Sequence, residues 1–212
     1  MRVLTVSPEK YADHSDELAQ MHRLRASIFR GRLEWDVTVT KSGEFDEYDK
    51  FDPTYILATT DDARVVGCAR LLPAEGPTML EGTFAQLLGS GSLCASPNMV
   101  ESSRFCVDTS VGEAREGGRL HLATLTMFAG IIEWSMSNGY NEIVTATDIR
   151  FERILNRAGW PMRRLGEPRE IGNTIAIAGS LPADPESFDR VRPVDYQSAI
   201  SHDARPKIRS AA

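Results

Sequence analysis

Residues 100–108 read VESSRFCVD, and this stretch determines the fold because it places charged residues within an apolar strand pattern. Its valine, phenylalanine and cysteine residues are typical of a partly buried β-strand. Glu101 and Arg104 interrupt that apolar pattern. A charged side chain inside a core is costly unless it is paired, so the stretch predicts a core strand whose charges have partners elsewhere in the chain.

The spacing of the two charges makes a further demand on the strand. Glu101 and Arg104 lie three positions apart, so strict alternation would place their side chains on opposite faces of the sheet. Both reach one cleft only if the strand bends or bulges between them. We therefore expect a β-bulge at Ser102-Ser103.

The composition is that of an ordinary globular protein, with 212 residues, 42% hydrophobic and 25% charged. No apolar run approaches the roughly 20 residues that a membrane span needs, and the start MRVLTV is too short for a signal peptide. We expect a cytoplasmic protein without a membrane partner. The formal net charge of −6 disfavours a general nucleic-acid binder, although it leaves room for a local basic patch.

The cysteines at 68, 94 and 106 are odd in number and form no CxxC pair. Neither a disulfide framework nor a zinc site is indicated, and no other metal site is expected. All three lie among apolar or small residues, which favours buried structural thiols.

Periodicity predicts one α/β domain with a mixed, mostly antiparallel twisted sheet flanked by helices. The chain carries no GxGxxG or Walker motif. The main domain is expected at 1–181, with 182–212 as a surface helix or tail of the same domain, and 31–53 reads as a loop. Strands are expected at 2–7, 55–60, 63–73, 99–108, 142–147, 162–166 and 173–181, and helices at 15–29, 83–88, 118–138 and 148–158.

The stretch EFDEYD at 44–49 packs four acids into six residues. Acidic runs are usually solvated loops. Here the aromatic residues Phe45, Tyr48, Phe51 and Tyr55 are interleaved with them, which indicates that the segment packs against the protein.

Three arginines stand where the pattern predicts burial, in the first helix and in two apolar strands. Each alone is compatible with an ordinary surface charge. Together they predict a paired network, which can hold an anionic or zwitterionic small molecule and fix a glutamate as general base. The expected members are Arg25, Arg70 and Arg104 facing Asp46, Asp49 and Glu101.

Taken together, four stretches resemble the LuxI-type acyl-homoserine-lactone synthases, and in particular their TraI-type branch. They are MHRLRASIFRGRLEWDV, GEFDEYDKFDPTYIL, GCARLLP and VESSRFCVD, and the resemblance extends over about 2–180. It implies a fold similar to the GNAT acyltransferases. It also implies that the amine of S-adenosyl-methionine attacks an acyl thioester held on acyl carrier protein, after which the methionine carboxylate closes a lactone and releases methylthioadenosine. The product would be a quorum-sensing signal, and no separate cofactor is implied.

The resemblance also implies roles for individual residues. The S-adenosyl-methionine site would involve Arg25, Phe29 and Trp35, where an aromatic face suits a sulfonium ion, although both rings also fit a plain core. Glu101 would be the general base for the amine. The catalytic set as a whole would be Glu101, Arg104, Arg70, Asp46 and Asp49.

The acyl chain is expected between the long helix and the strand EIVTAT. The candidate residues are Ser103, Phe105, Phe128, Ile131, Thr145 and Thr147. In the family, threonine at the position of Thr145 usually accompanies a 3-oxo group, which a hydroxyl can hydrogen-bond. We therefore expect a medium-length 3-oxoacyl chain such as 3-oxooctanoyl, although a β-branched residue is also ordinary in a strand.

A basic stripe is predicted on the helix at 148–158. Arg150, Arg153 and Arg157 are spaced by three and four, which places them on one face, and three more arginines follow at 163, 164 and 169. A solvated helix face is the ordinary interpretation. The resemblance favours docking of an acidic acyl carrier protein.

Two other classes of function remain open. An N-acetyltransferase that uses acetyl-CoA needs a pyrophosphate loop of the form R/Q-x-x-G-x-G/A. Residues 115–120, REGGRL, have the glycines without that spacing, which disfavours coenzyme A as donor but does not exclude it. A non-enzymatic module that senses a metabolite would not need Glu101, which is present.

Overall fold

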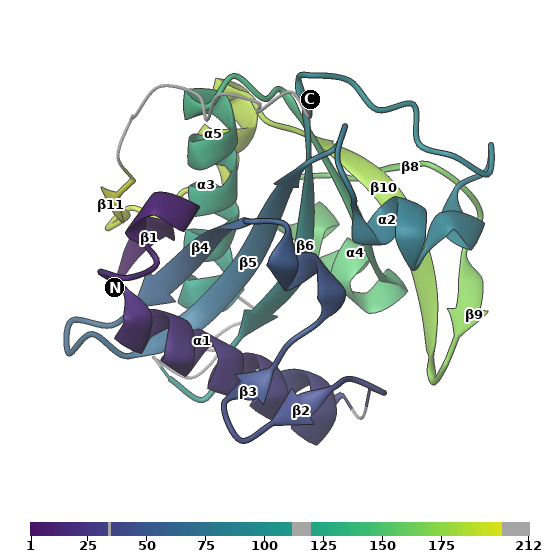
Figure 1. Cartoon of the computed structure of the whole chain (residues 1–212). Helices are drawn as coiled ribbons and strands as arrows, with labels where there is room; N and C mark the ends of the chain where they lie inside the picture. The colour runs from purple at the N-terminus through teal and green to yellow at the C-terminus, as the bar shows by residue number, and fades with distance from the viewer. Residues whose placement is uncertain (34, 112–119, 201–212) are drawn as a thin grey trace.

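The computed structural model describes residues 1–33, 35–111 and 120–200, and a nine-stranded sheet runs through it (Figure 1). The strand order is β11-β1-β4-β5-β6-β7-β10-β8, with β9 paired to β10. Among the strand pairs of the described ranges, only β1–β11 and β6–β7 are parallel, which confirms a mixed, mostly antiparallel sheet. The strands are β1 (Arg2–Val6), β4 (Thr54–Thr59), β5 (Val65–Pro73), β6 (Met99–Val107), β7 (Glu142–Asp148), β8 (Arg163–Arg164), β9 (Arg169–Ile171), β10 (Thr174–Pro182) and β11 (Gln197–Ala199).

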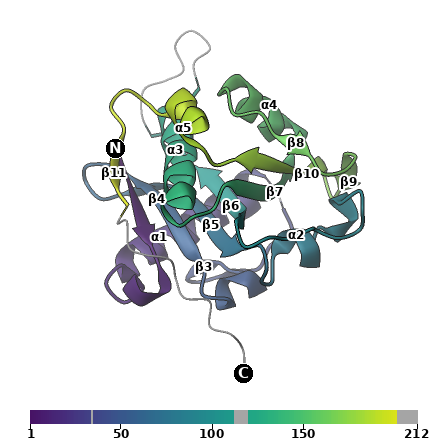
Figure 2. The ribbon, with the colours of Figure 1, turned by 90° about the horizontal axis from the view of Figure 1, so that it is seen from above.

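Helices cover both faces of the sheet, as the view from above shows (Figure 2). The main ones are α1 (Ser15–Ala26) on one face and α3 (Leu122–Ser137) on the other, accompanied by α2 (Met79–Gly82), α4 (Ile149–Arg157) and α5 (Pro185–Val191). No helix in the described ranges combines the length and apolar character that crossing a bilayer requires.

Alternation along β5 separates two apolar cores. Ala69 and Leu71 pack in the larger core with Met127 and Phe128 of α3. Cys68 points the other way, into a smaller core beneath α1. Arg70 has the same parity as Cys68, so it also lies on the α1 side, and it is completely buried there.

The expected strands are all present within a residue or two at each end, while the helices and loops differ more. The first helix ends at Ala26 and continues as a six-residue π-helical turn, Ser27–Arg32, a form that is frequent at functional sites. The helix expected from 118 begins at Leu122, with His121 accepting a hydrogen bond from the amide of Ala123. Residues 118 and 119 lie outside the described ranges.

Three local expectations were wrong. Residues 31–53 are more than a loop, because β2 (Val39–Thr40) pairs with β3 (Gly43–Glu44) and a 3₁₀ turn follows at Glu47–Lys50. Residues 83–88 hold only a 3₁₀ turn at Ala85–Leu87, and the short helix α2 lies before them, where Thr78 caps it. Cys94 is exposed, whereas Cys68 and Cys106 are buried as expected.

Up to residue 200, the segment after 181 forms regular secondary structure rather than only a tail. It carries α5, and β11 extends the sheet by pairing with β1. The weak apolar pattern of this segment did not reveal β11, because an edge strand of three exposed residues needs no apolar face.

At Gly130, α3 lies close against the sheet. A Cβ added there would lie 2.7 Å from a methyl group of Val3. We expect Gly130→Ala to lower the free energy of unfolding by about 2 kcal/mol through overpacking, measured by urea denaturation. Gly31→Ala is the control, since a Cβ there meets no atom of the described residues within 4 Å, and an equal loss in both variants would contradict the prediction.

Candidate active site

The β-bulge predicted for the strand of VESSRFCVD is present, but it lies later than Ser102-Ser103. Arg70 pairs with Ser103 and Cys68 with Cys106, so two steps along β5 match three along β6. The extra residue falls in this interval, where Arg104 adopts φ 53°. A left-handed backbone is unfavourable for arginine, and the ion pairs that its side chain makes offset that cost.

The bulge brings Arg104 to the side of the sheet on which Ser103 lies. Glu101 lies on that side too, because it stands two positions before Ser103 in the regular part of the strand. Arg104 reaches Glu44 and Ser103 reaches Arg70, both beneath α1. Phe105 faces the other way and packs its ring 5.4 Å from that of Phe128. Without the extra residue, Arg104 would point into the core beneath α3.

Six buried or nearly buried charges form a closed ring beneath α1, in which arginines and acids alternate. Each arginine contacts two acids, and each acid contacts two arginines. In order around the ring, the members are Arg25, Glu44, Arg104, Asp46, Arg70 and Asp49. We call this set the charge ring.

The distances around the charge ring are those of direct ion pairs. Arg25 donates from Nε to Glu44 at 2.5 Å and, with both terminal nitrogens, to Asp49 at 2.8 and 2.9 Å. Arg70 Nη1 lies 2.5 Å from Asp46 and 2.9 Å from Asp49. Arg104 lies 3.1 Å from Glu44 and 2.7 Å from Asp46.

One member of the charge ring, Glu44, was not among the predicted site residues. The predicted network instead placed Glu101 opposite the arginines, and that part was wrong. Glu44 and Asp46 lie two positions apart in an extended segment, so their carboxylates can face the same side. The aromatic residues in and after EFDEYD indicated that this segment packs against the protein. They did not indicate which of its acids face inward.

A tight turn fixes two of the ring carboxylates. Asp46 accepts from the amide of Tyr48, and Asp49 accepts from the amide of Asp46, which together make a capping box. The hydroxyl of Tyr55 also donates to Asp49. Burial alone would raise the pKa of Asp49, but Arg25 and Arg70 outweigh it and hold that pKa well below the usual range.

Glu101 lies outside the charge ring, and backbone amides hold its carboxylate in place. Its carboxylate accepts from the amides of Met79 at 3.0 Å and Leu80 at 2.6 Å. The side chain is almost completely buried, and this burial raises the pKa of Glu101 above the ordinary glutamate value despite those hydrogen bonds. A fixed carboxylate with a raised pKa is suited to accept a proton.

Ser103 connects the charge ring to Glu101. Its hydroxyl oxygen accepts from Arg70 Nε at 3.1 Å, and it also hydrogen-bonds the carboxylate of Glu101. Arg70 Nη2 is buried, and within the described ranges no protein atom accepts its hydrogen bond. The region beside Ser103 therefore has an arginine donor left for another molecule.

The two aromatic residues predicted for the site lie beside the charge ring. Phe29 and Trp35 stack with ring centroids 5.3 Å apart and planes inclined by 2°. The guanidinium of Arg104 lies 5.5 Å from the centroid of Phe29. The structure thus brings Arg25, Phe29 and Trp35 to the same region, although the side chain of Arg25 is fully enclosed by its partners.

On the α3 side, an apolar cavity of about 20 Å³ lies where β6 and β7 separate. These strands pair only over Met99–Glu101 and Glu142–Val144. Of the residues expected around the acyl chain, Phe105, Phe128, Ile131 and Thr145 line the cavity. Ser103 lies on the opposite face of the sheet, and Thr147 is not in the cavity wall.

The predicted basic stripe is exposed on α4, at Arg150, Arg153 and Arg157. Two of the arginines that follow are engaged in ion pairs. Arg164 forms a two-pronged pair with Glu152, and Arg163 lies 2.9 Å from Glu142. The glycine-containing stretch at 115–119 lies outside the described ranges.

The sequence and the structure were compared with known proteins. A family model described as autoinducer synthase matches residues 9–191. An acyl-homoserine-lactone synthase from Agrobacterium fabrum is 66% identical over 212 residues, the full length of both chains. The solved structure of BjaI, titled a CoA-dependent acyl-homoserine lactone synthase with SAM and isopentyl-CoA, is 25% identical with TM-score 0.80 and covers 93% of this chain and 92% of its own. A putative N-acetyltransferase from Lactobacillus plantarum, 12% identical with TM-score 0.55, covers 87% of this chain and 100% of its own and shares the fold, in agreement with a GNAT-like architecture.

Glu44 offers a direct test of the charge ring. Glu44→Gln removes the negative charge shared by Arg25 and Arg104, so we expect it to lower the free energy of unfolding by about 3 kcal/mol, measured by urea denaturation. Glu47→Gln is the matched control, because Glu47 is exposed in the adjoining turn and should change stability by less than about 0.5 kcal/mol. Equal effects in the two variants would refute the ring as a stabilising unit.

Proposed function

We propose a reaction for this chain on the premise that it belongs to the autoinducer synthase family and is an acyltransferase, an acyl-homoserine-lactone synthase that makes a quorum-sensing signal. In this proposal the acyl acceptor is S-adenosyl-methionine and the donor is an acyl thioester on acyl carrier protein. The chain transferred is a medium-length 3-oxoacyl group such as 3-oxooctanoyl. No further cofactor takes part.

The observation that carries the proposal is the position of Glu101, anchored at both oxygens and linked through Ser103 to the charge ring. In the first step Glu101 takes a proton from the α-ammonium group of S-adenosyl-methionine, directly or through a water. The free amine attacks the thioester carbonyl, the amide bond forms and the carrier thiol leaves. The methionine carboxylate then attacks the carbon beside the sulfonium, which closes the lactone and releases methylthioadenosine.

The charge ring supports this chemistry because its ion pairs fix the positions of its arginines. Arg25 is fully enclosed, so we assign it a positioning role rather than contact with substrate. The side chain of Arg104 is 11% exposed, and Arg70 has a buried nitrogen for which the described part of the chain supplies no acceptor, so these two are the candidates to bind substrate oxygens. The stacked Phe29 and Trp35 offer an aromatic face to the sulfonium.

The donor and the acyl chain rest on separate observations. The exposed arginines of α4 suit an acidic carrier protein. BjaI, the solved structure similar to this chain, is described as CoA-dependent, so acyl-CoA is the second candidate donor. Thr145 lines the apolar cavity, where its hydroxyl can donate a hydrogen bond to a 3-oxo group.

Mass spectrometry tests the reaction. Purified enzyme with S-adenosyl-methionine and a panel of acyl carrier protein thioesters and acyl-CoAs is expected to form acyl-homoserine lactone and methylthioadenosine together. Glu101→Gln should lower the rate by about 100-fold or more, since it removes the base. Because burial raises the pKa of Glu101, the wild-type rate should fall on acidification through a pKa above the ordinary glutamate range.

Glu81→Gln is the control for that variant, because Glu81 is an exposed acid of α2, the short helix whose amides bind Glu101, and it should retain full activity. Lactone formation at an undiminished rate in Glu101→Gln would remove Glu101 as the base. Absence of lactone from wild type with every donor would overturn the proposed reaction, and transfer to another amine would then favour an N-acetyltransferase.

Reversal of charge on α4 tests the docking surface. We expect Arg150→Glu with Arg153→Glu to raise the KM for acyl carrier protein by about tenfold at low salt, with kcat and the KM for a short acyl-pantetheine donor unchanged. Lys41→Glu, a reversal at the exposed tip of the β2–β3 hairpin, is the control. An equal effect on the carrier-free donor would show that the arginines act on folding or chemistry instead.

A further inference from the structure

We propose that Tyr48 is a positioning residue, whose hydroxyl group sets the place of α2 and, through α2, the place of the Glu101 carboxylate. This inference rests on the proposed function, because it takes Glu101 as the base. It adds a second link between the base and the charge ring, besides the one through Ser103.

The helix α2 is too short to hold its own position. It has four residues, Met79–Gly82, and a helix of this length is not stable in isolation. The amides of Met79 and Leu80 donate to Glu101, and the side chain of Thr78 accepts from the amide of Glu81. Any shift of α2 therefore moves the donors that hold the Glu101 carboxylate.

Tyr48 contacts the charge ring through its backbone and its phenol ring. It lies in the turn between Asp46 and Asp49, and its amide donates to Asp46 at 2.9 Å. The guanidinium carbon of Arg70 lies 5.5 Å from the centroid of the phenol ring. Because Tyr48 is also buried, these contacts fix the direction in which its hydroxyl points.

The hydroxyl of Tyr48 reaches α2. The phenol ring packs in one apolar cluster with Leu72 and Met79, and the hydroxyl lies 3.0 Å from Oγ1 of Thr83, the residue that follows α2. A Cβ added at Gly82 would overlap with this hydroxyl, whereas it would lie 3.3 Å from the adjoining ring carbon Cζ. The absence of a side chain at Gly82 therefore permits the contact between Tyr48 and the end of α2.

Loss of the hydroxyl would allow α2 to move relative to the turn of the charge ring. Burial raises the pKa of Glu101, and the hydrogen bonds from the amides of Leu80 and Met79 lower it. Weaker amide hydrogen bonds raise the pKa of the carboxylate further, so the base becomes protonated at a higher pH. A side chain that only stabilised the fold would leave this pH unchanged.

The experiment compares pH profiles of kcat/KM for S-adenosyl-methionine, measured with the acyl donor that the wild type uses best. Tyr48→Phe keeps the amide and the aromatic ring and removes only the hydroxyl, while Thr83→Val removes the partner of that hydroxyl beside α2. We expect both variants to lose activity on acidification at a pH higher than the wild type by about 0.5 units or more, because the carboxylate loses part of its hydrogen bonding.

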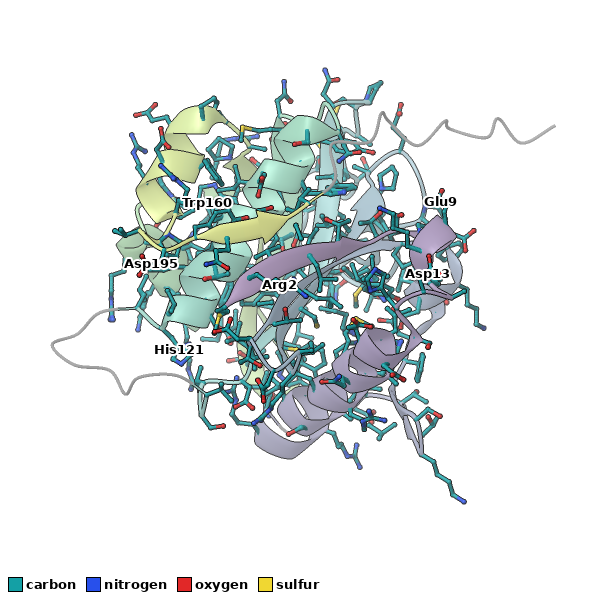
Figure 3. All side chains as sticks on the ribbon, turned by 90° about the vertical axis from the view of Figure 1, so that its left-hand side faces the viewer. Arg2, Glu9, Asp13, His121, Trp160 and Asp195 are labelled. Carbon is teal, nitrogen blue, oxygen red and sulfur yellow. The ribbon has the colours of Figure 1, made fainter. Side chains whose placement is uncertain are left out.

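Tyr196→Phe is the matched control for these profiles. The hydroxyl of Tyr196 is a partly buried donor as well, and it bonds Glu133 at 2.6 Å. Its neighbour Asp195 lies on the opposite side of the molecule from Asp13, which precedes α1 (Figure 3). The pH profile of this variant should therefore match that of the wild type.

Gly82→Ala tests the same contact by overlap. The added methyl group displaces α2 or the phenol ring, and we expect kcat/KM to fall by about tenfold at neutral pH. In the double variant with Tyr48→Phe the overlapping hydroxyl is absent, so kcat/KM should exceed that of Gly82→Ala by about threefold or more. Gly76→Ala is the control, because a Cβ there lies 3.5 Å from the carbonyl oxygen of Pro73, an ordinary contact, and its activity should equal that of the wild type.

Thermal unfolding establishes which variants are folded, and Thr83→Val carries the test if Tyr48→Phe is not. Unshifted pH profiles in the folded variants would overturn the role of Tyr48, even if their stability is lower, and so would a double variant no faster than Gly82→Ala. A wild type that forms no lactone from any donor, or a Glu101→Gln variant with an undiminished rate, would instead overturn the proposed function and this inference with it.

Discussion

Everything at the candidate site depends on keeping six charges away from water without leaving any of them unpaired. The charge ring meets this constraint by alternation, since three arginines and three acids share their contacts equally and the net charge is zero. Breaking a buried pair leaves an uncompensated charge, so the ring is stable only as a whole. It ties α1, the turn after β3, β5 and β6 into one unit.

The geometry of β6 follows from the same constraint. Arg104 can reach its two acids only because the strand holds an extra residue, and the left-handed backbone at Arg104 is maintained by those ion pairs. Glu101, two strand positions before Ser103, keeps the ordinary pleat and stays outside the ring, with its own backbone donors. The strand therefore separates a structural network from a carboxylate that remains free to accept a proton.

Sequence reasoning predicted the parts of this molecule that periodicity controls. The main strands, α1 and α4 follow apolar repeats, and the burial of Arg70 follows from its place in an apolar strand. Glu44 and the site of the bulge could not be predicted in this way, since both depend on which acid of a packed turn meets which arginine in three dimensions. The same holds for β11, whose pairing with β1 joins the two ends of the described chain.

The contacts of the charge ring also determine when it can form during folding. Its contacts join residues that are far apart along the chain, from 19 positions between Arg25 and Glu44 to 60 between Glu44 and Arg104. Contacts of this kind form only after much of the chain has already been ordered. The charge ring is therefore complete only in the folded chain, and local opening of the turn that carries Asp46 and Asp49 removes two of its three acids at once. The assembly of the charge ring is cooperative in the same sense as folding itself.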